Sequence, residues 1–197
     1  MLDEVSCPKK NGRFATSQCD AYVECVDGVG TYKLCPDGLL FDENAHLYGY
    51  PCGYPIDIDC TGRTDLQPAQ STELCARQFG YYKYGDSRNC GQFVNCAFGD
   101  GYIFTCPDGL AFNERTYKCD WPDEVESCNA EDFLEFSCPE ESKSIPEYET
   151  KLYPHPSDCQ RFFLCKSGRP RLQSCEETYV FNDISGECDS IANVTRW

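Results

Sequence analysis

Short runs of strand-forming residues alternate with glycine turns along the chain. The runs TYKL at residues 31–34 and YIFT at residues 102–105 follow Gly28 and Gly99, which each stand three positions after a cysteine. Gly168 has the same place in a third stretch. Because glycine suits the tight turn between two antiparallel strands, the pattern predicts three hairpins that turn at these glycines.

A second apolar pattern follows each predicted hairpin. It reads CPDGLLFD at residues 35–42, CPDGLAFN at 106–113 and CEETYVFN at 175–182. Pro-Asp-Gly predicts a tight turn, and the apolar run after it predicts a strand. Farther on, the first two stretches share an aromatic residue before proline, Tyr54 and Trp121, where the third has Ser190 and Ile191.

The cysteines give these patterns a common frame. In each of three sets, five residues separate the second and third cysteines, and nine separate the third and fourth. A repeated spacing requires the same loops to close each time, which indicates three copies of one small fold. The 17 cysteines are Cys7, Cys19, Cys25, Cys35, Cys52 and Cys60; Cys75, Cys90, Cys96, Cys106, Cys119 and Cys128; and Cys138, Cys159, Cys165, Cys175 and Cys188.

The repeats divide the chain into modules at 1–60, 75–128 and 138–197, joined by linkers at 61–74 and 129–137. The first linker is polar with one proline, which predicts a loose structure. The second contains Phe133, Leu134 and Phe136. A solvated tether has no need of these side chains, so we expect the second linker to pack on a neighbouring module.

Modules of this size cannot bury a large core, so disulfides are expected to stabilise them, at roughly 2–5 kcal/mol for each native bond. Metal binding is the alternative use of dense cysteine. It favours close C-x2-C pairs with histidine, whereas no such pair occurs here and neither His46 nor His155 stands at ligand spacing. We therefore predict no metal site and no cofactor.

Disulfides persist in oxidising compartments, so the composition predicts a secreted protein. Residues 1–6 lack the features of a signal peptide, and we expect either an added Met1 or a missing leader. No apolar run of about 18 residues is present to cross a bilayer. The formal charge of −16, from 33 acidic and 17 basic residues, disfavours nucleic acids and anionic membranes as partners.

The combined motifs resemble a known family. The segments CDAYVEC, CGQFVNC and CQRFFLC, together with CPDGLxF and CDWP, are similar to the peritrophin-A type of chitin-binding domain. Three copies with these linkers resemble the obstructor proteins of insect cuticle. The resemblance implies a small disulfide-rich β fold of three tandem tachycitin-like modules, each a three-stranded antiparallel sheet followed by a two-stranded hairpin.

The resemblance also implies a disulfide pairing, which spacing alone cannot choose among 15 possibilities per module. The implied pairs are Cys7–Cys25, Cys19–Cys60, Cys35–Cys52, Cys75–Cys96, Cys90–Cys128, Cys106–Cys119, Cys138–Cys165 and Cys175–Cys188. Cys159 is left unpaired, because its expected partner falls at Arg196 or Trp197. We expect the third module to be the least stable, and Cys159 to be able to link to another chain. Asn193 begins a glycosylation sequon, a short and weak signal.

The family's sugar contacts lie around the hairpin between the fourth and fifth cysteines. Carried over, they implicate Phe41, Asp42, Phe112, Asn113, Phe181 and Asn182, with Tyr54 and Trp121 adjoining. Aromatic rings suit the apolar face of N-acetylglucosamine, and amides or carboxylates direct its hydroxyls. The alternative is structural: the phenylalanines form the core, as we favour for Tyr22, Phe93 and Phe162, and Asn113 and Asn182 cap turns.

These observations predict a non-catalytic extracellular protein that organises chitin fibrils in cuticle or a similar matrix. The chitin could be partly deacetylated, and matrix proteins are possible further partners. The sequence has no nucleophile elbow, metal-protease helix or phosphate loop that would indicate an enzyme. A disulfide-rich protein-binding or inhibitor protein is the alternative, although it would not explain aromatic residues that recur at equivalent positions.

Overall fold

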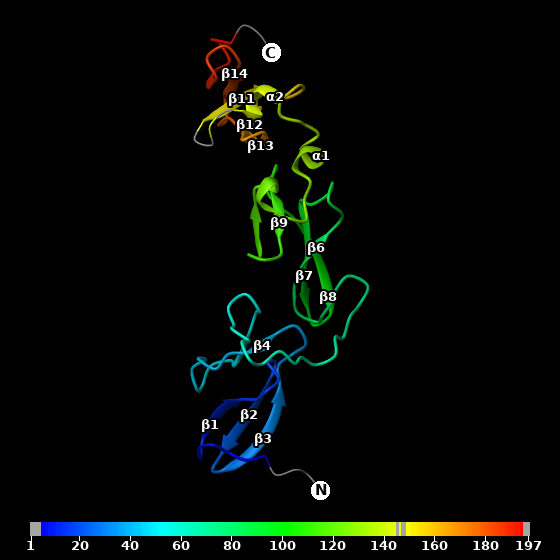
Figure 1. The fold of residues 1–197 in the computed structure, drawn as a ribbon, viewed down its shortest axis with the longest axis vertical. Helices are drawn as coiled ribbons and strands as arrows, with labels where there is room; N and C mark the ends of the chain where they lie inside the picture. Colours follow the sequence, from blue (N-terminus) through cyan, green and yellow to red (C-terminus); the bar gives the residue numbers. More distant parts are fainter. Residues whose placement is uncertain (1–4, 145, 147–148, 195–197) are drawn as a thin grey trace. The chain divides into compact units, whose positions relative to one another are not determined.

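The computed structural model describes residues 5–144, 146 and 149–194. In these residues strands form six small sheets (Figure 1). Three sheets have three strands, in the orders β1-β2-β3, β6-β7-β8 and β11-β12-β13, and three have two, β4-β5, β9-β10 and β14-β15. A three-stranded sheet is followed by a two-stranded hairpin three times along the chain. The prediction of a small disulfide-rich β fold is confirmed.

The bounds of the elements follow the repeats. In the first repeat the strands are β1 (Gly12–Ala15), β2 (Ala21–Val26), β3 (Val29–Leu34), β4 (Leu40–Phe41) and β5 (Cys52–Gly53). In the second they are β6 (Gly80–Tyr84), β7 (Gln92–Ala97), β8 (Asp100–Thr105), β9 (Ala111–Asn113) and β10 (Lys118–Asp120). In the third they are β11 (Thr150–Pro154), β12 (Arg161–Lys166), β13 (Arg169–Ser174), β14 (Tyr179–Asn182) and β15 (Glu187–Ser190). The short helices are η1 (Pro122–Glu124), α1 (Ala130–Leu134) and α2 (Glu140–Lys143).

The chain divides into two compact units, Met1–Tyr82 with Val94–Ile103 and Lys83–Phe93 with Phe104–Trp197. The first unit contains the whole of the first repeat and its junction with the start of the second. The other unit contains the hairpin of the second repeat, the second linker and the third repeat.

The turns of the three-stranded sheets lie at the expected glycines. Gly28, Gly99 and Gly168 have φ angles of 87°, 84° and 76°, the left-handed region that favours glycine. The residue before each glycine, such as Phe98, also has a positive φ, as a two-residue hairpin loop requires. The predicted hairpins at these three positions are confirmed.

Eight disulfides join the described residues, and they are the pairs that the family resemblance implies: Cys7–Cys25, Cys19–Cys60, Cys35–Cys52, Cys75–Cys96, Cys90–Cys128, Cys106–Cys119, Cys138–Cys165 and Cys175–Cys188. In each repeat the fourth and fifth cysteines staple the two-stranded hairpin. Cys159 is free and exposed. The positions at which its partner was expected, Arg196 and Trp197, lie outside the described residues.

The first linker differs from the loose tether that its composition suggests. The amide of Cys19 donates to the carbonyl of Asp65 at 2.9 Å, and the amide of Gln67 donates to the buried carboxylate of Asp20 at 2.9 Å. The side chain of Gln67 also donates to the carbonyl of Cys35 at 2.8 Å. Hydrogen bonds to residues that are distant in sequence therefore fix the linker against the first repeat. Composition alone does not reveal these hydrogen bonds.

The second linker packs as predicted. Phe133, on α1, contacts the buried group of Cys90, Ala111 and Val125. Phe136 stacks on the buried ring of Phe163 in the third repeat, with the ring centroids 4.0 Å apart. This linker therefore contributes apolar side chains to the repeats on both of its sides.

Candidate functional site

One pair of stacked rings recurs in every repeat. It joins the aromatic residue of the middle strand to the phenylalanine of the hairpin: Tyr22 with Phe41, Phe93 with Phe112 and Phe162 with Phe181, at centroid distances of 4.8, 4.5 and 4.7 Å. The hairpin rings are only 2%, 1% and 5% exposed. Each pair therefore joins the sheet to the hairpin as a small core, which is the structural alternative that the sequence left open for Phe41, Phe112 and Phe181.

The polar residue after each hairpin phenylalanine has a turn-capping hydrogen bond. The side-chain oxygens of Asp42, Asn113 and Asn182 accept from the backbone amide two residues farther on, at 2.8, 3.0 and 3.1 Å. In the second repeat Asn113 is buried and also donates to Asp120 at 2.9 Å. These three residues shape the hairpin turn, and any contact with a sugar would be an additional role.

Tyr54 and Trp121 are half-buried and face the repeat that follows. The ring of Tyr54 lies 5.4 Å from that of Tyr81, and the guanidinium of Arg171 lies 5.3 Å from the ring of Trp121. The Arg171 side chain is also bound by Asp123 at 2.8 Å. Both aromatic residues thus belong to junctions between repeats, which the sequence reasoning did not foresee.

An exposed ring extends the stack of the second repeat. Phe104, on β8, is 48% exposed, and its ring lies 5.6 Å from that of Phe93 at an interplanar angle of 19°. Phe93 stacks in turn on the buried Phe112. The exposed ring of Phe104, which is supported by the stack of Phe93 on Phe112, is a suitable flat surface for the apolar face of a sugar. The run YIFT has no alternation of apolar and polar residues that could have marked Phe104 as exposed, and sequence reasoning did not single it out.

The same face is charged in the first repeat. Lys33 stands where the second repeat has Phe104, and it donates to Glu24 at 3.0 Å, while Arg13 donates to Glu24 at 3.2 Å. The hydrogen bond from Lys33 contributes most, and the one from Arg13 next, to holding the pKa of the Glu24 carboxyl below its ordinary value. The third repeat has Gln173 at this position. The repeats therefore present different chemistry on equivalent strands.

Two surface cavities reach the predicted hairpin residues. One of about 220 Å3 in the first repeat is lined by Phe41 and Asp42 together with Asn11, Arg13 and Phe14. Another, of about 330 Å3 in the third repeat, is lined by Phe181, Arg161 and Asp158 among others. Each combines an aromatic edge with charged or amide side chains, which is the composition that a carbohydrate site requires. Asn11, Arg13 and Phe14 were missed from sequence because they lie on or just before β1, far from the hairpin in sequence.

The remaining sequence predictions concern single positions. Asn193 is exposed and donates to Asp189 at 2.9 Å, while Thr195 of the sequon lies outside the described residues. Within the described ranges, no cluster of His, Cys, Asp and Glu side chains is arranged to hold a metal ion. Likewise, no described helix has the length and apolar character that a membrane crossing needs.

Comparison with known proteins decides the family. The model of the chitin binding peritrophin-A domain matches residues 7–60, 75–128 and 146–196. The chain belongs to this family. Chitin binding by three small disulfide-stapled domains is therefore its function, as the resemblance implied. The third match begins after Cys138, although the Cys138–Cys165 disulfide ties that residue to the third repeat.

The chain is also similar to individual known proteins. The chain is 47% identical to protein obstructor-E of Drosophila melanogaster over 95% of its own length and 80% of the relative. It is 27% identical to peritrophin-1 of Anopheles gambiae over 54% of the chain and 72% of that protein. It is also 30% identical to probable chitinase 10 of Drosophila melanogaster over 70% of the chain, but this match covers only 6% of the relative.

Proposed function

We propose that the protein is a non-catalytic, secreted cross-linker that binds chitin through separate surfaces on its three repeats. The observation that carries the proposal is the stack of Phe104 on Phe93 and Phe112, which ends in an exposed ring. The cavities at Phe41 in the first repeat and Phe181 in the third supply polar groups beside an aromatic edge. Together these features give each repeat a surface on which a sugar ring could bind.

Several weak surfaces on one chain suit a fibril. When one surface is bound, the others meet the polymer at a high effective concentration, which could raise the apparent affinity by on the order of a hundredfold or more. The same arrangement allows different repeats to hold different fibrils. Organisation of chitin, rather than capture of single oligosaccharides, is the function that we favour.

A binding role is supported by the family matches, which take up residues 7–60, 75–128 and 146–196. Probable chitinase 10 shares only a small part of its length with this chain. We therefore assign the shared part to binding.

Secretion is supported by the eight disulfides, because such bonds persist in oxidising surroundings. The net charge of −16 would favour chitin that carries some ammonium groups after partial deacetylation. Binding to such a polymer should weaken as salt is added, since exposed charges are screened. Other matrix proteins are the further partners that we propose.

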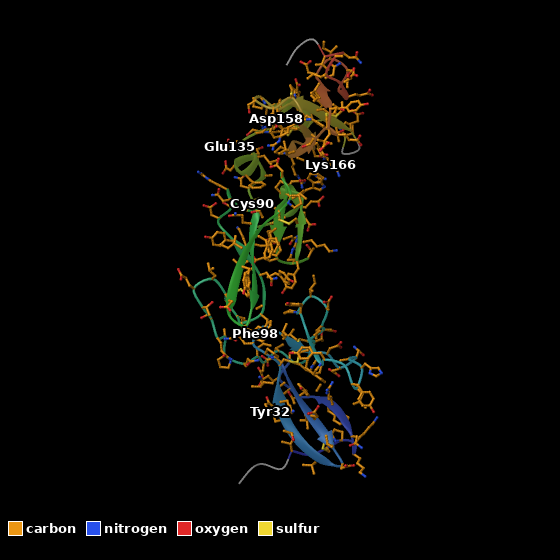
Figure 2. All side chains as sticks on the ribbon, turned by 180° about the vertical axis from the view of Figure 1, so that it is seen from behind. Tyr32, Cys90, Phe98, Glu135, Asp158 and Lys166 are labelled. Carbon is orange, nitrogen blue, oxygen red and sulfur yellow. A yellow bond between two sulfur atoms is a disulfide. The ribbon has the colours of Figure 1, made fainter. Side chains whose placement is uncertain are left out.

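The test is retention of the oxidised protein on chitin beads beside cellulose beads. We expect retention on chitin alone, lost after reduction of the disulfides. Phe104→Ala should lower retention, whereas Phe98→Ala, which removes another ring that is 79% exposed (Figure 2), should not. Failure of the oxidised protein to bind chitin would overturn the proposal and favour a protein-binding role. Bundling of chitin nanofibrils, followed by low-speed sedimentation, tests the cross-linking separately.

A further inference from the structure

One position on the outer strand of each three-stranded sheet borders the ring of the middle strand. It lies two residues before the fourth cysteine of each set and is occupied by Lys33, Phe104 and Gln173. Lys33 pairs with Tyr22 across β2 and β3, and Gln173 pairs with Phe162 across β12 and β13. Directly opposed residues have Cβ atoms about 4.5–5.5 Å apart, so this side chain lies beside the middle-strand ring. We call this place the flanking position.

In the second repeat the flanking position adds a ring. Phe104 stacks on Phe93 with the ring centroids 5.6 Å apart, and Phe104 is 48% exposed. Phe93 stacks in turn on the buried Phe112, at a centroid distance of 4.5 Å. The stack therefore ends in an aromatic surface that is open to a ligand and is supported by two further rings.

In the first repeat the flanking position holds an ion pair instead. Lys33 Nζ lies 3.0 Å from the carboxylate of Glu24, which also binds Arg13 at 3.2 Å. The ring of Tyr22 is only 8% exposed, so neither Lys33 nor Tyr22 presents an aromatic surface. A sugar ring that covered this place would have to desolvate the ion pair, which costs free energy without a compensating stack.

The third repeat lies between these two cases. Gln173 provides an amide, which can donate to and accept from sugar hydroxyls but has no apolar ring. Phe162 beside it is half-buried and stacks on Phe181, with the ring centroids 4.7 Å apart. The third repeat therefore leaves part of its middle-strand ring exposed, whereas the second adds an exposed ring and the first exposes almost none.

We infer that the residue at the flanking position determines how tightly the sheet of each repeat binds chitin. The second repeat, with Phe104, is the principal site among the sheets; the third binds more weakly, and the first does not bind through its sheet. The inference rests on the proposed chitin-binding function and adds to it an order among the repeats. It concerns the sheets alone and leaves the hairpin cavities of the first and third repeats as separate surfaces.

The test moves the ring from one repeat to another. Phe104→Ala should lower retention of the full oxidised chain on chitin beads, and adding Lys33→Phe to that variant should restore it through a new stack on Tyr22. Glu24 keeps Arg13 as a partner, so the exchange leaves no carboxylate unpaired. If a sugar gains from the new ring what an aromatic pair gains, the apparent affinity should rise roughly two- to tenfold.

Lys33→Met in the same Phe104→Ala background is the matched control. It removes the same charge and supplies an apolar side chain without a ring, so it should not restore retention. Gln173→Phe and Gln173→Leu form a second matched pair in the third repeat, of which only the first should restore retention. Because each expected result is a gain of binding to chitin and not to cellulose beads, misfolding cannot produce it.

Restoration by Lys33→Phe and Gln173→Phe, but by neither control, is the expected result. No restoration by either, in variants that keep the denaturation midpoint of Phe104→Ala, would overturn the inference and leave chitin binding intact. Unchanged retention of Phe104→Ala itself would overturn it too. Equal restoration by Lys33→Met would also overturn it, because loss of the ion pair rather than gain of a ring would then account for binding. An oxidised parent protein that is not retained on chitin would overturn the proposed function as well.

Discussion

The buried carboxylate of Asp37 lies 2.6 Å from the guanidinium of Arg77, and this ion pair joins the first repeat to the start of the second. The same carboxylate accepts from the amide of Gln70 at 2.7 Å and from that of Gln78 at 3.2 Å. The next residue, Gly38, lies so close to the carbonyl of Phe79 that a Cβ atom would clash with it. The turn of the CPDG motif is thus a docking element as well as a turn.

The second junction uses the same two positions of the motif. Asp108 binds Arg161 of the third repeat at 2.8 Å, and a Cβ on Gly109 would lie 2.7 Å from that of Leu172. The third repeat has Glu177 and Thr178 at these positions, and it also lacks the aromatic residue that Tyr54 and Trp121 supply. The third repeat therefore differs from the first two at the positions that form the junctions between repeats.

Replacement of Asp37 by asparagine should loosen the first junction. The variant removes the charge that binds Arg77. Its one oxygen can keep the two backbone amides that share Oδ2 only if its NH2 group faces Arg77, at a cost of about 1–3 kcal/mol. Trypsin should then cleave after Arg63 or Arg77 faster than in the parent protein. Asp108→Asn is the matched control, and its effect should be smaller because the Asp108 side chain is 59% exposed. Equal cleavage rates in the parent and Asp37→Asn would show that the Asp37–Arg77 ion pair does not hold the linker in place.

The first junction should also weaken in acid. Burial acts to raise the pKa of Asp37, but the hydrogen bonds from Gln70, Arg77 and Gln78 outweigh it and place the pKa below the ordinary 3.8. A carboxyl group with a lowered pKa in the folded state stabilises that state above its unfolded pKa, and this contribution is lost as the pH falls through the folded value. Protection of the Gln70 and Gln78 amides from hydrogen exchange should therefore fall below about pH 3.8. Asp37→Asn should show no such step.

Sequence reasoning reached the elements that depend on neighbouring residues. Gly28, Gly99 and Gly168 indicated their turns, because a positive φ favours glycine. Phe133 and Phe136 indicated a packed linker, because a solvated tether does not need phenylalanine. It did not reach contacts that depend on how distant segments fold back. The linker after Cys60 reads as polar and loose, yet it is fixed by Asp20 and Asp37, carboxylates that lie far away in sequence.

The candidate site shows the same limit. The sequence marks β8 as a strand, but whether Phe104 or Phe112 is the exposed member of a stack depends on which ring the hairpin covers. In the structure the hairpin supplies the buried ring and the third strand supplies the exposed one. The assignment of sugar contacts to Phe41, Phe112 and Phe181 stays a prediction; Phe41 and Phe181 line cavities.

Two substitutions in one stack should separate binding from stability. Phe112→Ala removes a buried ring and should destabilise the second repeat by about 3–5 kcal/mol. Phe104→Ala removes a ring that is half exposed, so it should lower retention on chitin with much less effect on the denaturation midpoint. Denaturant unfolding and bead retention, measured on both variants, check this division. A large loss of stability in Phe104→Ala would instead make that ring part of the core.

Cys159 should react as a single free thiol. It is exposed, whereas the other 16 cysteines are paired. A thiol-specific reagent should therefore label one site in the folded oxidised protein, and Cys159→Ser should abolish the labelling. Non-reducing electrophoresis would show a disulfide-linked dimer in the parent protein alone. Labelling at more than one site would mean that another disulfide is incomplete.

The third repeat should open before the others. In the first two repeats the second and sixth cysteines close loops of 41 and 38 residues, while the corresponding Cys159 is unpaired. Loss of such a bond typically costs about 2–5 kcal/mol. Hydrogen exchange of the oxidised chain in mild denaturant should thus be fastest in β14 and β15, although the Cys175–Cys188 disulfide still joins them. Slower exchange there than in β9 and β10 would mean that packing around Phe181 and Val180 compensates fully for the missing bond.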